Sequence, residues 1–144
     1  MEGITGVIVL VELAVLGVIA VYDLRTLRAP NAIVYPALVF ALVAAVLLEG
    51  AGIQAWLGAG AAFALTLALA LVSRGAMGMG DVKVAALCGA IVGLKGVPMM
   101  LTLAFVVAGV ISLVLLLMRL RGRRDAIALT PFLGLGAAVT VLLA

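Results

Sequence analysis

Three acidic residues lie within, or at the ends of, long apolar segments of this 144-residue chain. Glu12 lies in the middle of the first segment, Asp23 closes it, and Asp81 opens a later one. An ionisable group inside a membrane is costly unless it is neutralised or paired, so each is a candidate for function. Two carboxyl groups in close contact share a proton, so one can act as a base while the other acts as an acid. Such a pair can activate water to cleave a peptide bond.

The composition excludes a soluble globular protein. Hydrophobic residues make up 68% of the chain and charged residues 10%, whereas soluble domains are roughly half apolar and a quarter charged. The single cysteine, Cys88, excludes an internal disulfide framework, and the absence of histidine removes the usual zinc ligands. We therefore expect no metal and no other cofactor, and the solvent for most of the chain must be lipid.

The apolar segments predict a single all-α domain, residues 1–144, that forms a bundle of membrane-spanning helices. A span needs about 20 apolar residues, with roughly 17 to 25 as the usual range. Six spans are predicted, at residues 4–22, 32–48, 55–73, 82–94, 97–118 and 128–144.

The basic residues indicate the orientation of these spans. With alternating loops, eight of the nine lie on one side, four of them between Arg119 and Arg124, and only Lys95 lies on the other. This asymmetry places the first side in the cytoplasm and both termini outside, and it makes a nucleic-acid partner unnecessary. Asp23 and Asp81 are then expected at matching depths near the cytoplasmic face.

The fourth predicted span is unusually short, because only 13 residues separate Asp81 from Lys95. A helix of that length covers about 20 Å of a roughly 30 Å hydrocarbon layer. Either the membrane thins or the helix continues past Lys95, or the glycine-rich stretch 75–80 dips into the membrane. Small residues at Ala85, Gly89 and Gly93 would let another helix approach this span closely.

Each acidic residue also has a structural interpretation. Asp23 could pair with Arg25 or Arg28 at the interface, and Asp81 could be the N-cap of the fourth helix. Glu12 lies eleven residues before Asp23, on the same helix face but about 16 Å away. We therefore expect Glu12 to have a structural or tuning role rather than to join the carboxylate pair.

Three residues beside Asp81 could contribute to substrate binding or to loop geometry. Gly78 and Gly80 lack a Cβ atom, so their backbone can lie against an extended peptide. Lys83 could orient a substrate carbonyl, or could extend its ammonium group to the interface.

Two motifs in this order resemble the type IV prepilin peptidase family of membrane aspartic proteases. The first runs from Asp23 to Pro30 and Asn31, and the second is Gly78-Met-Gly80-Asp81. Near the C-terminus, Thr130-Pro131-Phe132 is similar to the family's proline-containing final helix. The resemblance implies that Asp23 and Asp81 are the catalytic pair and that Pro30 and Asn31 shape the loop that follows the first span.

The resemblance also implies the substrate and the location. Members cleave the short leader peptide of prepilin-like or archaeal preflagellin-like membrane proteins at the cytoplasmic side of the bacterial or archaeal cytoplasmic membrane, in pilus biogenesis or type II secretion. Larger members carry an extra cytoplasmic region with paired cysteines and methylate the new N-terminus. This chain lacks that region, so it is similar to the compact, peptidase-only branch associated with tight-adherence pili or archaeal relatives. Its expected partners are such a substrate and membrane lipids.

Two other functions are compatible with buried carboxylates. A small proton- or cation-coupled transporter would use the same residues as a proton relay, although short spans without an evident internal repeat argue against it. A structural subunit of a membrane assembly would leave the intramembrane acids unexplained.

Overall fold

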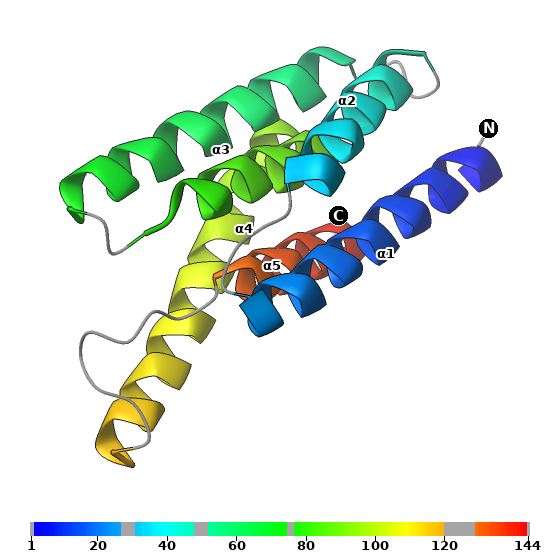
Figure 1. The fold of residues 1–144 in the computed structure, drawn as a ribbon. Helices are drawn as coiled ribbons and strands as arrows, with labels where there is room; N and C mark the ends of the chain where they lie inside the picture. The colour runs from blue at the N-terminus through cyan, green and yellow to red at the C-terminus, as the bar shows by residue number, and fades with distance from the viewer. Residues whose placement is uncertain (1, 27–30, 48–51, 75–76, 120–128, 144) are drawn as a thin grey trace.

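The chain folds into five helices in the computed structural model, which describes residues 2–26, 31–47, 52–74, 77–119 and 129–143 (Figure 1). The helices are α1 (Glu2–Thr26), α2 (Asn31–Leu47), α3 (Gly52–Val72), α4 (Met79–Leu117) and α5 (Thr130–Leu143). The prediction of an all-α bundle is therefore confirmed.

Three of these helices are long and apolar enough to cross a membrane. They are α1 from Gly6 onward, α3 and α4, whereas α2 and α5 are shorter apolar helices of 17 and 14 residues. A helix suits a lipid environment because every backbone amide and carbonyl in its interior is hydrogen-bonded within the segment. Six spans are not established: three helices meet the length for crossing, and the predicted segments 82–94 and 97–118 both lie within α4, whose helical geometry is interrupted at Gly93.

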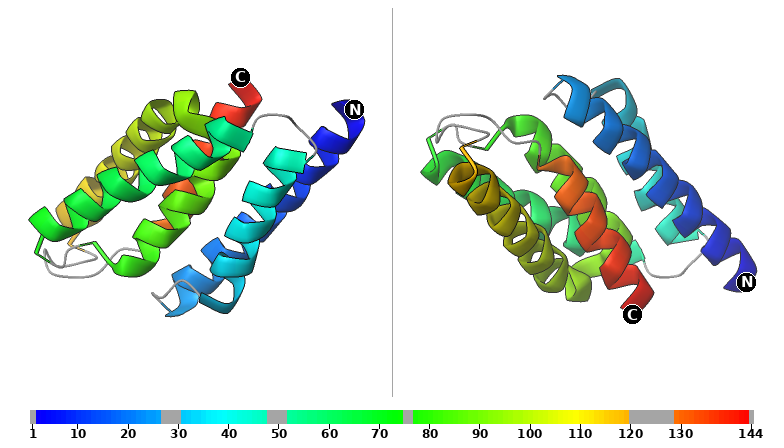
Figure 2. Two further views of the ribbon diagram at one scale, coloured as in Figure 1. Left: turned by 90° about the horizontal axis from the view of Figure 1, so that it is seen from above. Right: turned by 90° about the horizontal axis from the view of Figure 1, so that it is seen from below.

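A sharp reversal at Gly93 divides α4 into two arms. Gly93 has φ 71° and ψ 171°, a backbone conformation that is essentially restricted to glycine. The chain changes direction there, so residues 79–92 and 94–117 run in roughly opposite directions (Figures 1 and 2). A straight helix of 39 residues would measure about 58 Å, nearly twice the hydrocarbon thickness. The predicted division near Lys95 and Gly96 thus occurs two residues earlier.

The first arm of α4 packs closely against α3 because both helices present glycine at the contact. A Cβ atom added to Gly58 would collide with the backbone oxygen of Gly89, and one added to Gly89 would collide with that of Gly58. Ala62 and Ala85 continue this contact and are fully buried. The expectation that Ala85 and Gly89 lie on a closely packed face is therefore confirmed.

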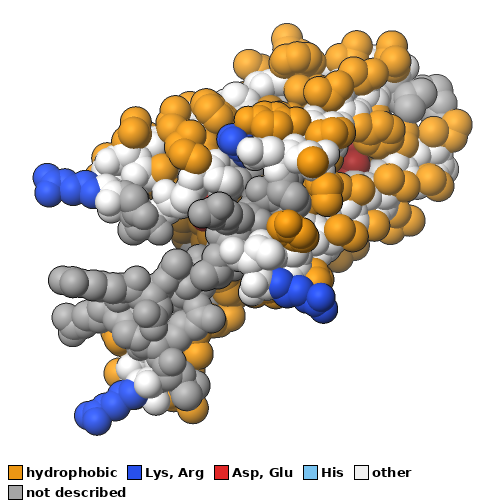
Figure 3. Space-filling model, in the orientation of Figure 1, with side chains coloured by type: hydrophobic (Ala, Val, Ile, Leu, Met, Phe, Trp, Pro, Cys, Tyr) orange, Lys and Arg blue, Asp and Glu red, His pale blue; other side chains and the backbone are white. Residues whose placement is uncertain are grey.

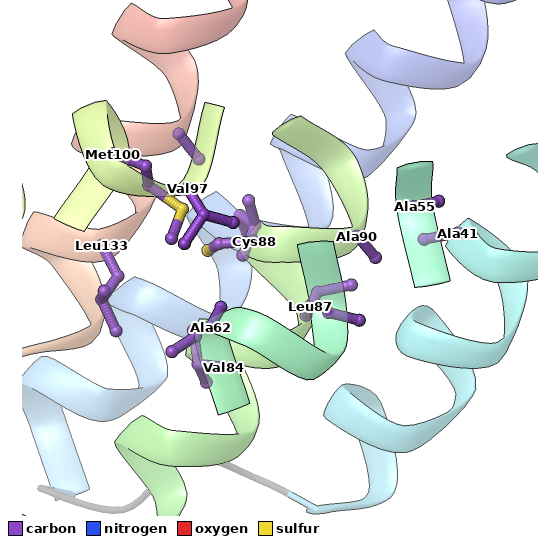
Figure 4. Packing of buried hydrophobic residues seen from close by; sticks show 14 of the residues in the cluster. Ala41, Ala55, Ala62, Val84, Leu87, Cys88, Ala90, Val97, Met100 and Leu133 are labelled. Atoms are coloured by element: carbon purple, nitrogen blue, oxygen red, sulfur yellow. The ribbon is translucent and has the colours of Figure 1, made fainter. Parts of the chain in front are cut away.

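The second arm of α4 packs against α5 in a similar way, with Gly136 lying on the backbone oxygen of Met100. Cys88 from the first arm and Val97 and Met100 from the second gather where the two arms meet (Figure 4). Leu133 of α5 joins the same cluster. The core is therefore filled by side chains from both sides of the reversal.

The helix α1 buries one face along its length. Ile8, Glu12, Leu16, Ile19 and Asp23 are buried, at the three- and four-residue spacing of a helix face. Glu12 and Asp23 therefore share a face, as predicted. Figure 2 shows α1 beside α2 on one side and beside α5 on the other.

Most of the outer surface is apolar. Large hydrophobic side chains such as Leu10, Leu71 and Leu142 are more than 60% exposed. Figure 3 shows an apolar face on which only a few Lys and Arg side chains project, in its left and central parts. A water-soluble protein rarely exposes such large apolar patches, so this surface is suited to lipid.

We expect Gly58→Ala to destabilise the fold, because the new methyl group has no space against the backbone of Gly89. Overpacking of this kind costs about 1–3 kcal/mol. Gly60→Ala is the matched control, since a Cβ atom there meets nothing within 4 Å. Thermal unfolding in detergent should show a lower midpoint for the Gly58 variant alone; equal midpoints for the two variants would contradict the close contact.

Candidate active site

Asp81 lies in the first turn of α4 and is held by the start of that helix. The N-cap is Gly78, whose backbone is extended (φ −76°, ψ 152°). The Asp81 backbone N–H donates to the Gly78 oxygen at 3.1 Å, and a backbone hydrogen bond from Gly78 reaches the Asp81 carboxyl group. The bond from the Gly78 amide to the Asp81 carboxyl group is one half of a capping box; the other half is missing because glycine has no side chain to cap the helix. The alternative that Asp81 is itself the N-cap is therefore wrong.

Asp23 lies one turn before the end of α1 and is almost fully buried, at 3% exposure. Its Oδ2 atom has no hydrogen-bond partner among the described residues. Arg28, one of the two partners considered for it, lies outside the described residues. A buried carboxyl oxygen without a partner is rare in folded proteins and calls for an explanation.

The fold brings Asp23 and Asp81 together. They come from α1 and α4, and the charge of Asp23 acts on the Asp81 carboxyl group. Asp81 is half-buried, so this interaction takes place in surroundings that are poorly screened by water. The fold therefore provides two carboxyl groups from separate helices that influence each other electrostatically.

A third side chain, Thr130 at the start of α5, reaches the same site. Its hydroxyl donates to Asp81 Oδ1 at 3.3 Å, and the residue is fully buried. In the C-terminal sequence motif, Thr130 stands only as the residue before Pro131, and the motif gives no indication of its contact with Asp81. The hydrogen bond joins residues that are far apart in sequence, so no local pattern could have indicated it.

Lys83 and Asn31 lie side by side in the first turns of α4 and α2. The Lys83 Nζ donates to Asn31 Oδ1 at 3.2 Å and lies 5.1 Å from the centre of the Tyr35 ring. These contacts tie the start of α4 to the start of α2. Tyr35 lies outside the two sequence motifs. Its position one turn after Asn31, on the same face of α2, is the signal that could have indicated this contact. Pro30 lies outside the described residues.

Glu12 is buried away from the site, on the same face of α1 as Asp23 but nearer the N-terminus. It lines an apolar cavity of about 380 Å³ between α1 and α2, together with Pro36, Phe40 and Leu87. Among the described residues, no three His, Cys, Asp or Glu side chains are grouped so that they could hold a metal ion.

The glycine-rich stretch is described in part. Gly75 lies outside the described residues, Gly78 is the N-cap, and Gly80 already belongs to the first turn of α4. Gly78 has ordinary negative φ, so what it contributes here is an unobstructed backbone beside Asp81. A Cβ atom at Gly78 would lie 3.8 Å from Asp81 Oδ2.

The fold and the site together define a class: a multi-pass helical membrane protein with two interacting carboxyl groups at helix ends, suited to acid–base catalysis. The family model described as the type IV leader peptidase family matches residues 10–113. The chain belongs to this peptidase family, as its motifs predict. Asp23 and Asp81 fall inside the matched region and Thr130 falls outside it. Comparison with curated proteins and with solved structures found no match.

We expect Lys83→Met to lower the thermal stability of the protein by about 1 kcal/mol, because it removes a hydrogen bond and a cation–π contact at a partly exposed position. Asn31→Ala should have part of this effect. Tyr35→Phe is the control, since it keeps the ring that faces the ammonium group. Thermal unfolding midpoints in detergent measure these differences in stability. A Lys83 variant as stable as the parent would show that the contacts of Lys83 with Asn31 and Tyr35 do not stabilise the fold.

Proposed function

We propose that this chain is an intramembrane aspartic endopeptidase that removes the short leader peptide of type IV prepilin-like or preflagellin-like membrane proteins. The observation that carries the proposal is the meeting of Asp23 and Asp81, from separate helices, inside a chain of the type IV leader peptidase family. The Oδ2 atom of Asp23 adds support, because it is buried without a partner among the described residues, and a bound water or substrate would supply one.

The two carboxyl groups would act on different reactants in the same step, one on the attacking water and the other on the scissile carbonyl group. The ionised carboxylate takes a proton from water as the water oxygen attacks the scissile carbonyl carbon, and the protonated carboxyl group donates its proton to the carbonyl oxygen. The tetrahedral intermediate then collapses as the C–N bond breaks. The carboxyl group that gained the water proton gives it to the leaving nitrogen, and the other carboxylate takes a proton from a hydroxyl of the intermediate, so that a carboxylic acid and an amine result. At the end the pair again holds one proton. Each carboxyl group therefore serves as both acid and base during a turnover.

The substrate strand would lie beside the start of α4. Gly78 and Gly80 offer backbone without side chains there, and Lys83 presents an ammonium group held by Asn31 and Tyr35. Pro30, which directly precedes Asn31, would orient the adjoining loop. This arrangement suits an extended peptide whose carbonyl groups face Lys83 and whose scissile bond lies over the carboxylate pair.

The topology that we propose counts the two arms of α4 as separate crossings. Six crossings then place both termini outside and the carboxylate pair at the cytoplasmic side of the membrane. The distribution of basic residues supports this orientation, because Lys95 lies near the reversal of α4 while the other eight lie at the opposite ends of the spans. We infer a peptidase without methyltransferase activity, because the sequence contains a single cysteine and therefore no cysteine pair.

Asp23→Asn and Asp81→Asn should each abolish cleavage of a purified prepilin-like substrate in detergent, by at least about a thousandfold, because an amide can neither accept nor share the proton. Asp125→Asn is the control, since the sequence places it in the hydrophilic segment 119–125. The mass shift of the substrate reports cleavage, and an unchanged unfolding midpoint shows that the variants fold. Cleavage at the parent rate by either site variant would exclude the carboxylate pair.

Glu12→Gln should reduce activity or stability without eliminating cleavage. The side chain is buried on the same face as Asp23, yet it lies about 16 Å along the helix from that residue. Glutamine keeps its size and its capacity for hydrogen bonds. Rates and unfolding midpoints measured together would separate the two effects, whereas complete loss of cleavage in a folded variant would give Glu12 a direct catalytic role.

A further inference from the structure

The Thr130 hydroxyl differs from most of the other side-chain hydroxyls described in the helices. Those hydroxyl groups donate to a backbone carbonyl of their own helix, as Thr66 does to Ala62 and Thr140 does to Gly136. Thr130 instead donates to a side chain of another helix, at Asp81 Oδ1. It can do so because it is the first residue of α5, where no preceding helical turn offers a carbonyl for its hydroxyl.

Two donors from different elements hold the Asp81 carboxyl group. A backbone hydrogen bond from Gly78 comes from the start of its own helix, and the Thr130 hydroxyl comes from α5. Asp23 on α1 is the titratable group that interacts with it. Lys83 of the same helix turns to Asn31 and Tyr35 on α2 instead. Rotation of the Asp81 side chain is therefore restricted from two directions.

We propose that Thr130 is a positioning residue of the peptidase: its buried hydroxyl fixes the orientation of the Asp81 carboxyl group against Asp23. The inference rests on the proposed function and extends it, because Thr130 lies outside the region that the family model matches. A hydrogen bond to a carboxylate also stabilises the ionised form over the protonated form. Thr130 thus contributes both geometry and charge stabilisation to the pair.

Because Thr130 is buried, it could serve only to pack the core rather than to position Asp81. Substitutions that separate packing from hydrogen bonding distinguish these two roles. Valine has nearly the same shape as threonine but lacks the donor, so Thr130→Val keeps the packing and removes the hydrogen bond. Serine keeps the donor and removes a methyl group. Thr140→Val is a matched control on the same helix, since Thr140 is also buried and donates only to its own helix backbone.

We expect Thr130→Val to lower kcat about tenfold to a hundredfold with little change in KM, as the loss of one hydrogen bond to a charged group implies. The acidic limb of its pH–rate profile should move to higher pH, because the ionised pair has lost a donor. Thr130→Ser should recover most of kcat and the parent profile. Thr140→Val should keep the parent kcat and profile, even if its unfolding midpoint falls.

Three results would overturn the proposal. They are a parent-like kcat and pH profile in Thr130→Val, an equal loss of kcat in Thr130→Ser and Thr130→Val, or an equal loss of kcat in Thr140→Val. Failure of the proposed function is recognised separately, by a parent protein that cleaves no prepilin-like substrate.

A measurement without substrate then decides whether Thr130 acts on Asp81. The rate at which a water-soluble carbodiimide modifies Asp81 is followed against pH by mass spectrometry. The midpoint should lie at higher pH in Thr130→Val than in the parent or in Thr140→Val, and identical midpoints would overturn the proposal.

Discussion

The structure depends on holding two carboxyl groups together in surroundings that disfavour charge. A state in which both carboxyl groups are ionised is costly there, because the two negative charges repel each other with little screening by water. The helices that carry Asp23 and Asp81 must therefore be held by contacts elsewhere. The glycine contact between Gly58 and Gly89 fixes α4 on α3, and Gly136 fixes α5 on the second arm of α4. These contacts hold α4 and α5, whereas α1, which carries Asp23, packs on α5 and α2 through a buried face that includes Leu16 and Ile19.

The features that the sequence could predict are those encoded by local chemistry. Hydropathy alone indicates helices in lipid, and helical periodicity alone puts Glu12 and Asp23 on one face of α1. The spacing of Ala85 and Gly89 indicates close helix packing because small side chains permit it whatever the partner. The two motifs predict the family because each combines an aspartate with residues that restrict or free the backbone: proline in the first motif and glycine in the second.

The features that escaped prediction depend on contacts between distant segments. The charge of Lys95 suggested a division of α4 near Lys95, yet the break occurs at Gly93, where the backbone adopts positive φ beside Gln54 of α3. The hydrogen bond from Thr130 to Asp81 spans 49 positions in the chain. One local feature was also predicted wrongly: the N-cap is Gly78 rather than Asp81, and the Asp81 carboxyl group accepts from the Gly78 amide three residues earlier.

The attachment of α5 to Asp81 has a consequence for biosynthesis. Chains are made from the N-terminus, so α1 and α4 enter the membrane before α5 leaves the ribosome. Until Thr130 arrives, Asp81 has only the amide of its own helix as a donor. A partly synthesised chain therefore holds both aspartates without their final arrangement, and the site is complete only once α5 has been inserted.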